Sequence, residues 1–188
     1  MPFPLITKRL IVRPFRLSDD DAFHTVLGDP EVMKDIPGGP SPSVPATRSK
    51  LRRIIEMQDR YGLSMWALIE RESNTIIGDC GLMLVEGKGP EIELTYDIAR
   101  EKWGEGFATE AAHVCLKYGF EELDLEEIIA ITYPHHQASR RVMEKAGMTY
   151  RRVHRYYDRD MVVYSYTREE YSGFQGAVPE ATCANASL

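Results

Sequence analysis

The sequence predicts a single α/β domain, of the α+β type, in which helices flank one central, strongly bent mixed β-sheet of about seven strands. Segments of strand-like and helix-like periodicity alternate along the chain. A chain of 188 residues is expected to form one core. A strand, two closely spaced glycines and a helix rich in small residues also follow one another at residues 91–123. We expect the domain at residues 1–171, followed by a disordered tail at residues 172–188, where Gly, Pro, Ala and Ser predominate.

The first third of the chain predicts one strand and three helices. A capping box at Ser18–Asp21 would open the first helix, and the Pro-, Gly- and Ser-rich segment 37–45 predicts a loop. Apolar residues at helical spacing predict the long helix that follows this loop. The expected elements are a strand at residues 6–15 and helices ending near Leu27, at 30–36 and at 46–61.

The remainder of the chain predicts six strands and two helices. A turn at residues 72–74 joins the first two strands into a hairpin, and Gly147 is expected to end the second helix. Small residues such as Ala112 on one face of the first helix would let it pack closely on the sheet. The expected strands are 65–70, 75–85, 91–98, 127–132, 148–157 and 161–167, and the expected helices are 106–123 and 137–145.

The turn at Gly104 and Gly106 predicts a site for a diphosphate. Glycine lacks a Cβ, so the backbone can adopt unusual dihedrals and approach a ligand closely. The first amides of the following helix have no intrahelical partner and lie at its positive end. We expect the main-chain nitrogens of this segment to bind the diphosphate, namely those of Gly104, Glu105, Gly106, Phe107, Ala108 and Thr109.

Two other nucleotide-binding patterns fit this turn less well. A Walker loop requires Gly-Lys-Ser or Gly-Lys-Thr, and neither occurs in the sequence. A dinucleotide fingerprint requires a third glycine where this chain has Thr109, and it follows its strand more closely than Gly104 does.

The segment Trp103-Gly104-Glu105-Gly106-Phe107-Ala108 resembles the acyl-CoA turn of the GNAT acetyltransferases, although Trp103 replaces the Gln or Arg usual at its first position. The segment 134–148 is similar to that family's second signature. Residues 6–14 resemble the entry strand of its ribosomal-protein N-terminal (alanine/serine) acetyltransferase branch. The three segments occur in the family's order and extend the resemblance over residues 5–170.

The resemblance implies a GNAT fold in which two parallel strands splay apart and hold acyl-CoA between them. Backbone groups near Ile98 would bind the pantetheine arm as an added strand would. His136 stands where the family usually has an asparagine that helps to hold this arm. Trp103 would stack on the adenine or pack under the turn. Acetyl-CoA is therefore the expected co-substrate.

Acetyl transfer to an amine requires a base, because amines are mostly protonated at neutral pH. Glu93 is the first candidate, since it lies on the strand expected to face the thioester and burial there would raise its pKa. Glu91 projects to the same side because side chains alternate along a strand. The alternative role for Glu93 is a solvated strand edge or an ion pair.

The departing sulfur also needs a proton source. Many GNAT enzymes place a tyrosine where this chain has Met143, which cannot donate a proton. Ser139 matches the serine of the ribosomal-protein branch and is the second catalytic candidate, the alternative being that it caps the helix. Adjacent His135 and His136 have no third ligand nearby in the sequence, so no metal site is expected.

Composition and charge exclude several classes of protein. The formal net charge is −6 and no long basic run occurs, so we expect no direct binding of nucleic acid. No apolar run approaches the roughly 20 residues of a membrane span, and no signal peptide is evident. Three widely spaced cysteines predict neither a disulfide framework nor a zinc site. A cytoplasmic monomer or homodimer is expected.

The predicted function is direct transfer of an acetyl group from acetyl-CoA to a primary amine within a ternary complex. The acceptor would be a protein N-terminal α-amine or a small-molecule amine. A catalytically silent acyl-CoA-binding module is the alternative suggested by Met143 and His136. A dinucleotide-dependent oxidoreductase is the more distant alternative suggested by Gly104 and Gly106.

Overall fold

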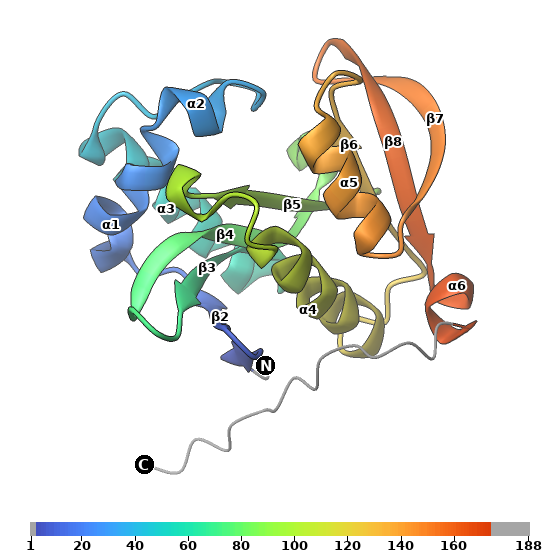
Figure 1. Ribbon diagram of the computed structural model, residues 1–188, viewed down its shortest axis with the longest axis horizontal. Coiled ribbons are helices and arrows are strands. Elements are labelled where there is room, and N and C mark those ends of the chain that lie inside the picture. The colour runs from blue at the N-terminus through green and yellow to red at the C-terminus, as the bar shows by residue number, and fades with distance from the viewer. Residues whose placement is uncertain (1–2, 174–188) are drawn as a thin grey trace.

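The computed structural model describes residues 3–173, which form one eight-stranded mixed sheet with helices on its faces (Figure 1). The strand order is β1-β2-β3-β4-β5-β6-β8-β7. Neighbouring strands are antiparallel except β5 and β6, which run parallel. The strands are β1 (Leu5–Ile6), β2 (Leu10–Pro14), β3 (Ser64–Glu70), β4 (Thr75–Leu84), β5 (Ile92–Ile98), β6 (Glu127–Thr132), β7 (Thr149–Tyr156) and β8 (Arg159–Thr167).

The helices lie close to the positions predicted from periodicity. Helix α5 has the predicted bounds, whereas α3 begins two residues earlier than expected because Ser43 accepts a hydrogen bond from the amide of Ala46 and so caps it. The helices are α1 (Asp20–Leu27), α2 (Pro30–Met33), α3 (Val44–Tyr61), α4 (Phe107–Glu121), α5 (Gln137–Lys145) and α6 (Arg168–Gly173), with short 3-10 turns η1 (Leu17–Asp19), η2 (Val85–Gly87) and η3 (Arg100–Lys102).

The single N-terminal strand predicted at residues 6–15 is wrong. The chain turns back at Thr7 to Arg9, so that Leu5 pairs with Val12 and two short antiparallel strands form. The carboxylate of Glu110 on α4 accepts hydrogen bonds from the Thr7 hydroxyl and the Arg9 amide, which holds this turn. The extra strand explains why the sheet has eight strands rather than about seven.

The capping box predicted at Ser18–Asp21 is also wrong. The carboxylate of Asp19 accepts the amide of Arg16 and both terminal nitrogens of the Arg13 guanidinium. These bonds lower the pKa of Asp19 against the effect of its burial, which acts in the opposite direction. The chain therefore enters α1 through a short 3-10 turn fixed by Asp19, and the Ser18 hydroxyl does not cap it.

Alternate residues of the central strands form separate hydrophobic cores on the two faces of the sheet, as the strand period of two requires. Trp66 and Leu68 of β3 pack toward α4, whereas Ala67 and Ile69 pack with Phe23 of α1 and with α3. Figure 1 shows α4 lying across β4 and β5, and α5 packed beside β6, β7 and β8. Helix α6 runs through Gly173, past the predicted domain boundary, and the rest of the predicted tail lies outside the described residues.

Candidate active site

The parallel strands β5 and β6 separate almost as soon as they meet. Their only registered pair in the described part of the chain is Glu93 with Ile129. A cavity of about 260 Å³ opens at this split, between the sheet, α5 and the α2 segment. Its lining comprises Val32, Asp35, Ile36, Pro37, Met65, Met83, Glu93, Leu94, Thr95, Tyr96, Asp97, Ile131, Thr132, His136, Ser139, Met143, Tyr157 and Met161.

The glycine turn before α4 has the geometry that a diphosphate requires. Gly104 and Gly106 have φ angles of +79° and +85°, which side chains other than glycine rarely adopt. The first α-helical bond runs from the Glu110 amide to the Gly106 carbonyl, so the preceding amides are left at the positive end of the helix. A Cβ built at Gly104 would meet no atom within 4 Å, so the turn has room for a ligand beside it. The residues fit the diphosphate of coenzyme A.

Arg9, which the sequence analysis missed, supports this turn from the N-terminal hairpin. Its guanidinium donates to the Glu105 carbonyl oxygen at 2.9 Å and to the Glu110 carboxylate at 2.7 Å. The guanidinium carbon also lies 4.2 Å from the centre of the Phe107 ring. Glu110 is therefore engaged by the hairpin, which leaves the helix start free of a capping carboxylate. No local pattern around Arg9 indicates this role, since the residue was expected within a strand.

Trp103 connects the turn to the end of β5. Its indole nitrogen donates to the Ile98 carbonyl oxygen at 2.7 Å, while 47% of the residue remains exposed. The bond uses one lone pair of the carbonyl expected to bind the pantetheine arm, and a carbonyl oxygen can accept a second bond. Trp103 thus fixes the position of the turn relative to β5, and its exposed part is open to a ligand.

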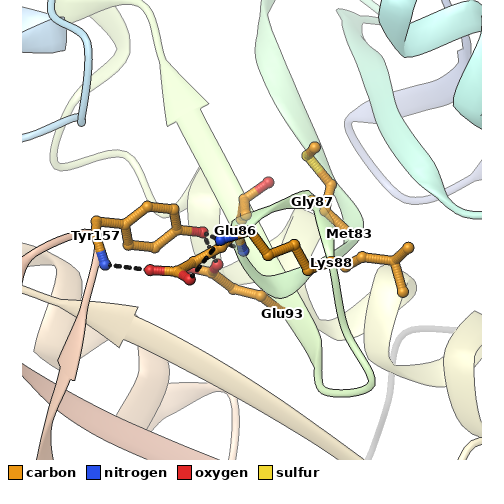
Figure 2. A pocket seen from close by; sticks show the side chains of 8 residues that line it. Met83, Glu86, Gly87, Lys88, Glu93 and Tyr157 are labelled. Carbon is orange, nitrogen blue, oxygen red and sulfur yellow. Dashed lines mark hydrogen bonds and ion pairs between the residues drawn. The ribbon is translucent and has the colours of Figure 1, made fainter.

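Glu93 is buried at the split and accepts a hydrogen bond from the Tyr157 hydroxyl at 2.6 Å (Figure 2). Burial raises the pKa of Glu93 to about 7, although the bond from Tyr157 acts to lower it. Glu93 lines both the cavity at the split and an adjoining cavity of about 370 Å³ beside η2. A carboxyl that titrates near neutral pH beside a cavity is suited to accept a proton.

The structure separates Glu91 from this role. Its carboxylate accepts hydrogen bonds from the Tyr156 hydroxyl at 2.7 and 2.8 Å and lies 3.5 Å from the Arg152 guanidinium. The Glu91 side chain is 39% exposed and lines neither cavity. Glu91 and Glu93 accept hydrogen bonds from the adjacent Tyr156 and Tyr157, so they point to the same side, as strand alternation predicted, but only Glu93 is buried at the split.

Tyr157 is a second residue that the sequence analysis missed. It has a positive φ of 51°, and its amide donates to the Glu86 carboxylate at 2.7 Å across the cavity beside η2 (Figure 2). Glu86 also has a positive φ, of 53°. This hydrogen bond therefore joins the turn at Glu86 to the turn at Tyr157, next to Glu93. The expected strand ended at residue 157, but nothing in the sequence gave a reason for the Tyr157 ring to reach β5.

A pair of hydroxyl groups lies on the other side of the split. The Tyr96 hydroxyl is 2.9 Å from Ser139 Oγ and 3.0 Å from the Ser139 carbonyl oxygen, to which it donates. Helix α5 begins at Gln137 after His136, so the alternative that Ser139 caps the helix is wrong. Met143 lines the cavity beside this pair and brings no proton. Tyr96 thus brings a hydroxyl group to this side of the cavity, where the thioether of Met143 has no proton to donate.

His136 lies at the edge of the cavity, where its Nδ1 is 3.3 Å from Thr132 Oγ1. Burial lowers its pKa, while the nearby Asp35 acts to raise it. Asp35 is 2.9 Å from Nε2 of the neighbouring His135.

In residues 3–173 there is no group of three or more His, Cys, Asp or Glu side chains placed to hold a metal ion. Nor does any helix in that range have the length and apolar character needed to cross a bilayer.

The splayed parallel strands, the glycine turn and the buried carboxyl at the split together define an acyl-CoA-dependent acetyltransferase. The acetyltransferase (GNAT) domain model matches residues 9–149, and the chain belongs to this family.

Its relatives agree with this assignment. The chain is 29% identical over 175 residues to the N-acetyltransferase p20 of Bacillus licheniformis, a match that covers 90% of this chain and 98% of that protein. A GNAT-family acetyltransferase structure from Bacillus anthracis superposes with a TM-score of 0.76 at 28% identity, covering 88% of this chain and 98% of that one.

A structure of a ribosomal L7/L12 α-N-protein acetyltransferase in complex with coenzyme A also has this fold, with a TM-score of 0.75. The match covers 86% of this chain and 96% of that one. At 17% identity this likeness concerns the fold alone.

Proposed function

We propose that this protein transfers an acetyl group from acetyl-CoA to a primary amine by direct attack within a ternary complex. The observation that carries the proposal is the position of Glu93, a buried carboxyl that titrates near neutral pH at the point where β5 and β6 separate. Acetyl-CoA supplies an activated thioester, and the chain's own residues supply the positions and the proton transfers.

The amides at residues 104–109 would hold the diphosphate, with Ile98, Trp103 and His136 beside the pantetheine arm. This arrangement would place the acetyl group between Glu93 on one side of the split and the Tyr96–Ser139 hydroxyl pair on the other. Positioning of this kind can contribute about 7–11 kcal/mol to lowering the barrier.

Glu93 would accept the proton that the attacking amine loses, directly or through one water molecule. Its raised pKa, about 7, brings it closer to the pKa of an α-amine, about 7.7–8.0, which lowers the free energy required for this transfer. On the opposite side, the Ser139 hydroxyl would donate a hydrogen bond to the departing sulfur, while Tyr96, which donates to Ser139, would hold that hydroxyl in place. Neither cysteine within residues 3–173 takes part in a covalent relay, because Cys80 and Cys115 are buried in the core and do not line the cavity.

The test is to measure release of free thiol from acetyl-CoA in the presence of peptides with free N-termini, polyamines and aminoglycosides, with mass spectrometry of the products. We expect thiol release that depends on the amine, together with a mass increase of one acetyl group on the acceptor. A catalytically silent acyl-CoA-binding module would instead bind coenzyme A and release no thiol with any acceptor, and that result would refute the proposal. Membership of the acetyltransferase family leaves no support for the dinucleotide alternative.

A further inference from the structure

Acetyl transfer as described makes no use of two carboxyl groups near the cavity. Asp97 on β5 lines the cavity, and Asp79 on β4 is its direct partner in the antiparallel register. Directly paired residues point to the same face of a sheet, so Asp79 lies behind Asp97 on the cavity side. Asp79 is completely buried, with an exposed fraction of 0%.

Hydrogen-bonding capacity at this end of the cavity is unused within residues 3–173. Neither carboxyl oxygen of Asp79 has a hydrogen-bond partner there, and neither does the buried hydroxyl of Thr95, which lines the cavity between Glu93 and Asp97. Buried polar atoms in folded proteins are normally hydrogen-bonded, and each exception requires an explanation. For Thr95, which lines the cavity, a bound polar ligand supplies that explanation.

The charge at this end is negative. Burial raises the pKa of Asp79 well above its usual range, and the charge of Asp97 raises it further. Burial also raises the pKa of Asp97, to about 6. Above that pH Asp97 is ionised. Lys50 on α3 lowers the pKa of Asp97 through its charge, but in the described part of the chain no ion pair or hydrogen bond joins them. The residues that line the cavity include neither Lys nor Arg.

A second negative group lies at the other end of the same strand. Glu93 and Asp97 are four positions apart on β5, so their Cα atoms are separated by about 13 Å at about 3.3 Å per residue. The wall between and around them is mainly apolar, with Met65, Met83, Leu94, Ile131 and Met161. A mainly apolar cavity lined by Glu93 and Asp97 toward opposite ends of β5, with Asp35 as a further lining carboxylate, matches an aliphatic chain that carries a cationic amine at each end.

We propose that the acceptor is a linear diamine or polyamine, with one amine placed near Glu93 for acetylation and a second, charged amine held by Asp97. The inference rests on the proposed acetyl transfer and adds the class of substrate. Thr95, whose hydroxyl has no partner within residues 3–173, would accept a further hydrogen bond from the second amine, and Asp79 lies directly behind Asp97.

Binding can be tested separately from turnover by calorimetry on the full chain in the presence of coenzyme A. The probes are 1,8-diaminooctane and octylamine, which differ only in the second amine, at about pH 8, where Asp97 is ionised. We expect the diamine to bind at least about tenfold more tightly, as hydrogen bonds to charged groups typically provide. Asp97→Asn should reduce the preference to about twofold or less. Asp59→Asn, which removes a carboxylate from the exposed side of α3, should retain it.

Equal affinity of the two amines for the wild-type protein would overturn the inference, as would a preference that survives in a folded Asp97→Asn variant. If that variant does not fold, the affinity of the wild-type protein for a series from 1,4-diaminobutane to 1,12-diaminododecane decides. The absence of an optimal chain length, relative to the matched monoamines, would also overturn the inference. Thiol release with monoamines and no diamine preference would leave acetyl transfer standing without the Asp97 subsite. Tight diamine binding without thiol release would leave the Asp97 subsite standing and refute acetyl transfer.

Discussion

The hydroxyl of Tyr157 lies 2.6 Å from Oε2 of Glu93, and the two residues are 64 positions apart in the sequence. The bond favours the ionised form of a carboxyl whose burial favours the protonated form, and burial has the larger effect. In the proposed mechanism Glu93 is therefore a base that gains its activity near neutral pH, and Tyr157 is the contact that adjusts the pH at which this occurs.

Tyr157→Phe is expected to raise the pKa of Glu93, because it removes the hydrogen bond that stabilises the carboxylate. The pH profile of kcat/KM should keep its shape, with its rising limb moved upward by about 1–2 pH units, the equivalent of about 1.5–3 kcal/mol for a hydrogen bond to a charged group. Tyr61→Phe, at an exposed ring on α3, is the matched control. A profile that stays in place or moves to lower pH would contradict the assignment.

Glu93→Gln is expected to remove the limb of the pH profile that rises through about pH 7 in the wild-type protein. Because the deprotonated form is the active one, the loss should be greatest above pH 7, where about 10²–10⁴-fold of the rate depends on the base. Glu91→Gln is the matched control and should change the rate by no more than a few fold, since Glu91 lies outside both cavities. Similar losses in the two variants would show that Glu93 has no special role.

Tyr96→Phe and Ser139→Ala should each lower kcat by roughly 2–10-fold, the range expected for one hydrogen bond. Their hydroxyls are 2.9 Å apart and in our proposal Tyr96 acts through Ser139, so the double variant should lose less than the product of the two single losses. Single-turnover rates with acetyl-CoA provide the measurement, and Tyr150→Phe on exposed β7 provides the control. Fully independent effects would mean that the two hydroxyls do not act as a pair.

Gly104→Ala should weaken the binding of coenzyme A far more than it destabilises the fold. Its positive φ of 79° costs about 1–2 kcal/mol for a residue with a Cβ, whereas the Cβ itself would meet no protein atom within 4 Å. We expect the affinity for coenzyme A, measured by calorimetry, to fall at least about tenfold and the melting temperature to fall by only a few degrees. Gly38→Ala has a comparable φ of 92° far from α4 in the sequence and controls for the backbone effect. Unchanged affinity in the Gly104 variant would place the diphosphate elsewhere.

The sequence by itself determined most of the order of elements, because the evidence for each is local. Glycines at 104 and 106, the strand period of two around Glu93 and the helical spacing of 137–145 are visible within a few residues of each other. Where a neighbouring element overrode the local pattern, the prediction was wrong. Glu110, some hundred residues downstream, holds the turn that splits the first strand, and Asp19 replaces the predicted cap by binding Arg13.

Only the tertiary structure decided which residues surround the cavity at the split. Tyr157 reaches Glu93 from the β7–β8 turn, Tyr96 meets Ser139 across the split, and Asp79 is placed behind Asp97 by the pairing of β4 with β5. These contacts join segments that are far apart in the chain, and periodicity has no information about which faces will meet. The pKa of Glu93 follows from the same cause, since burial at a split between two strands arises only when both strands are in place.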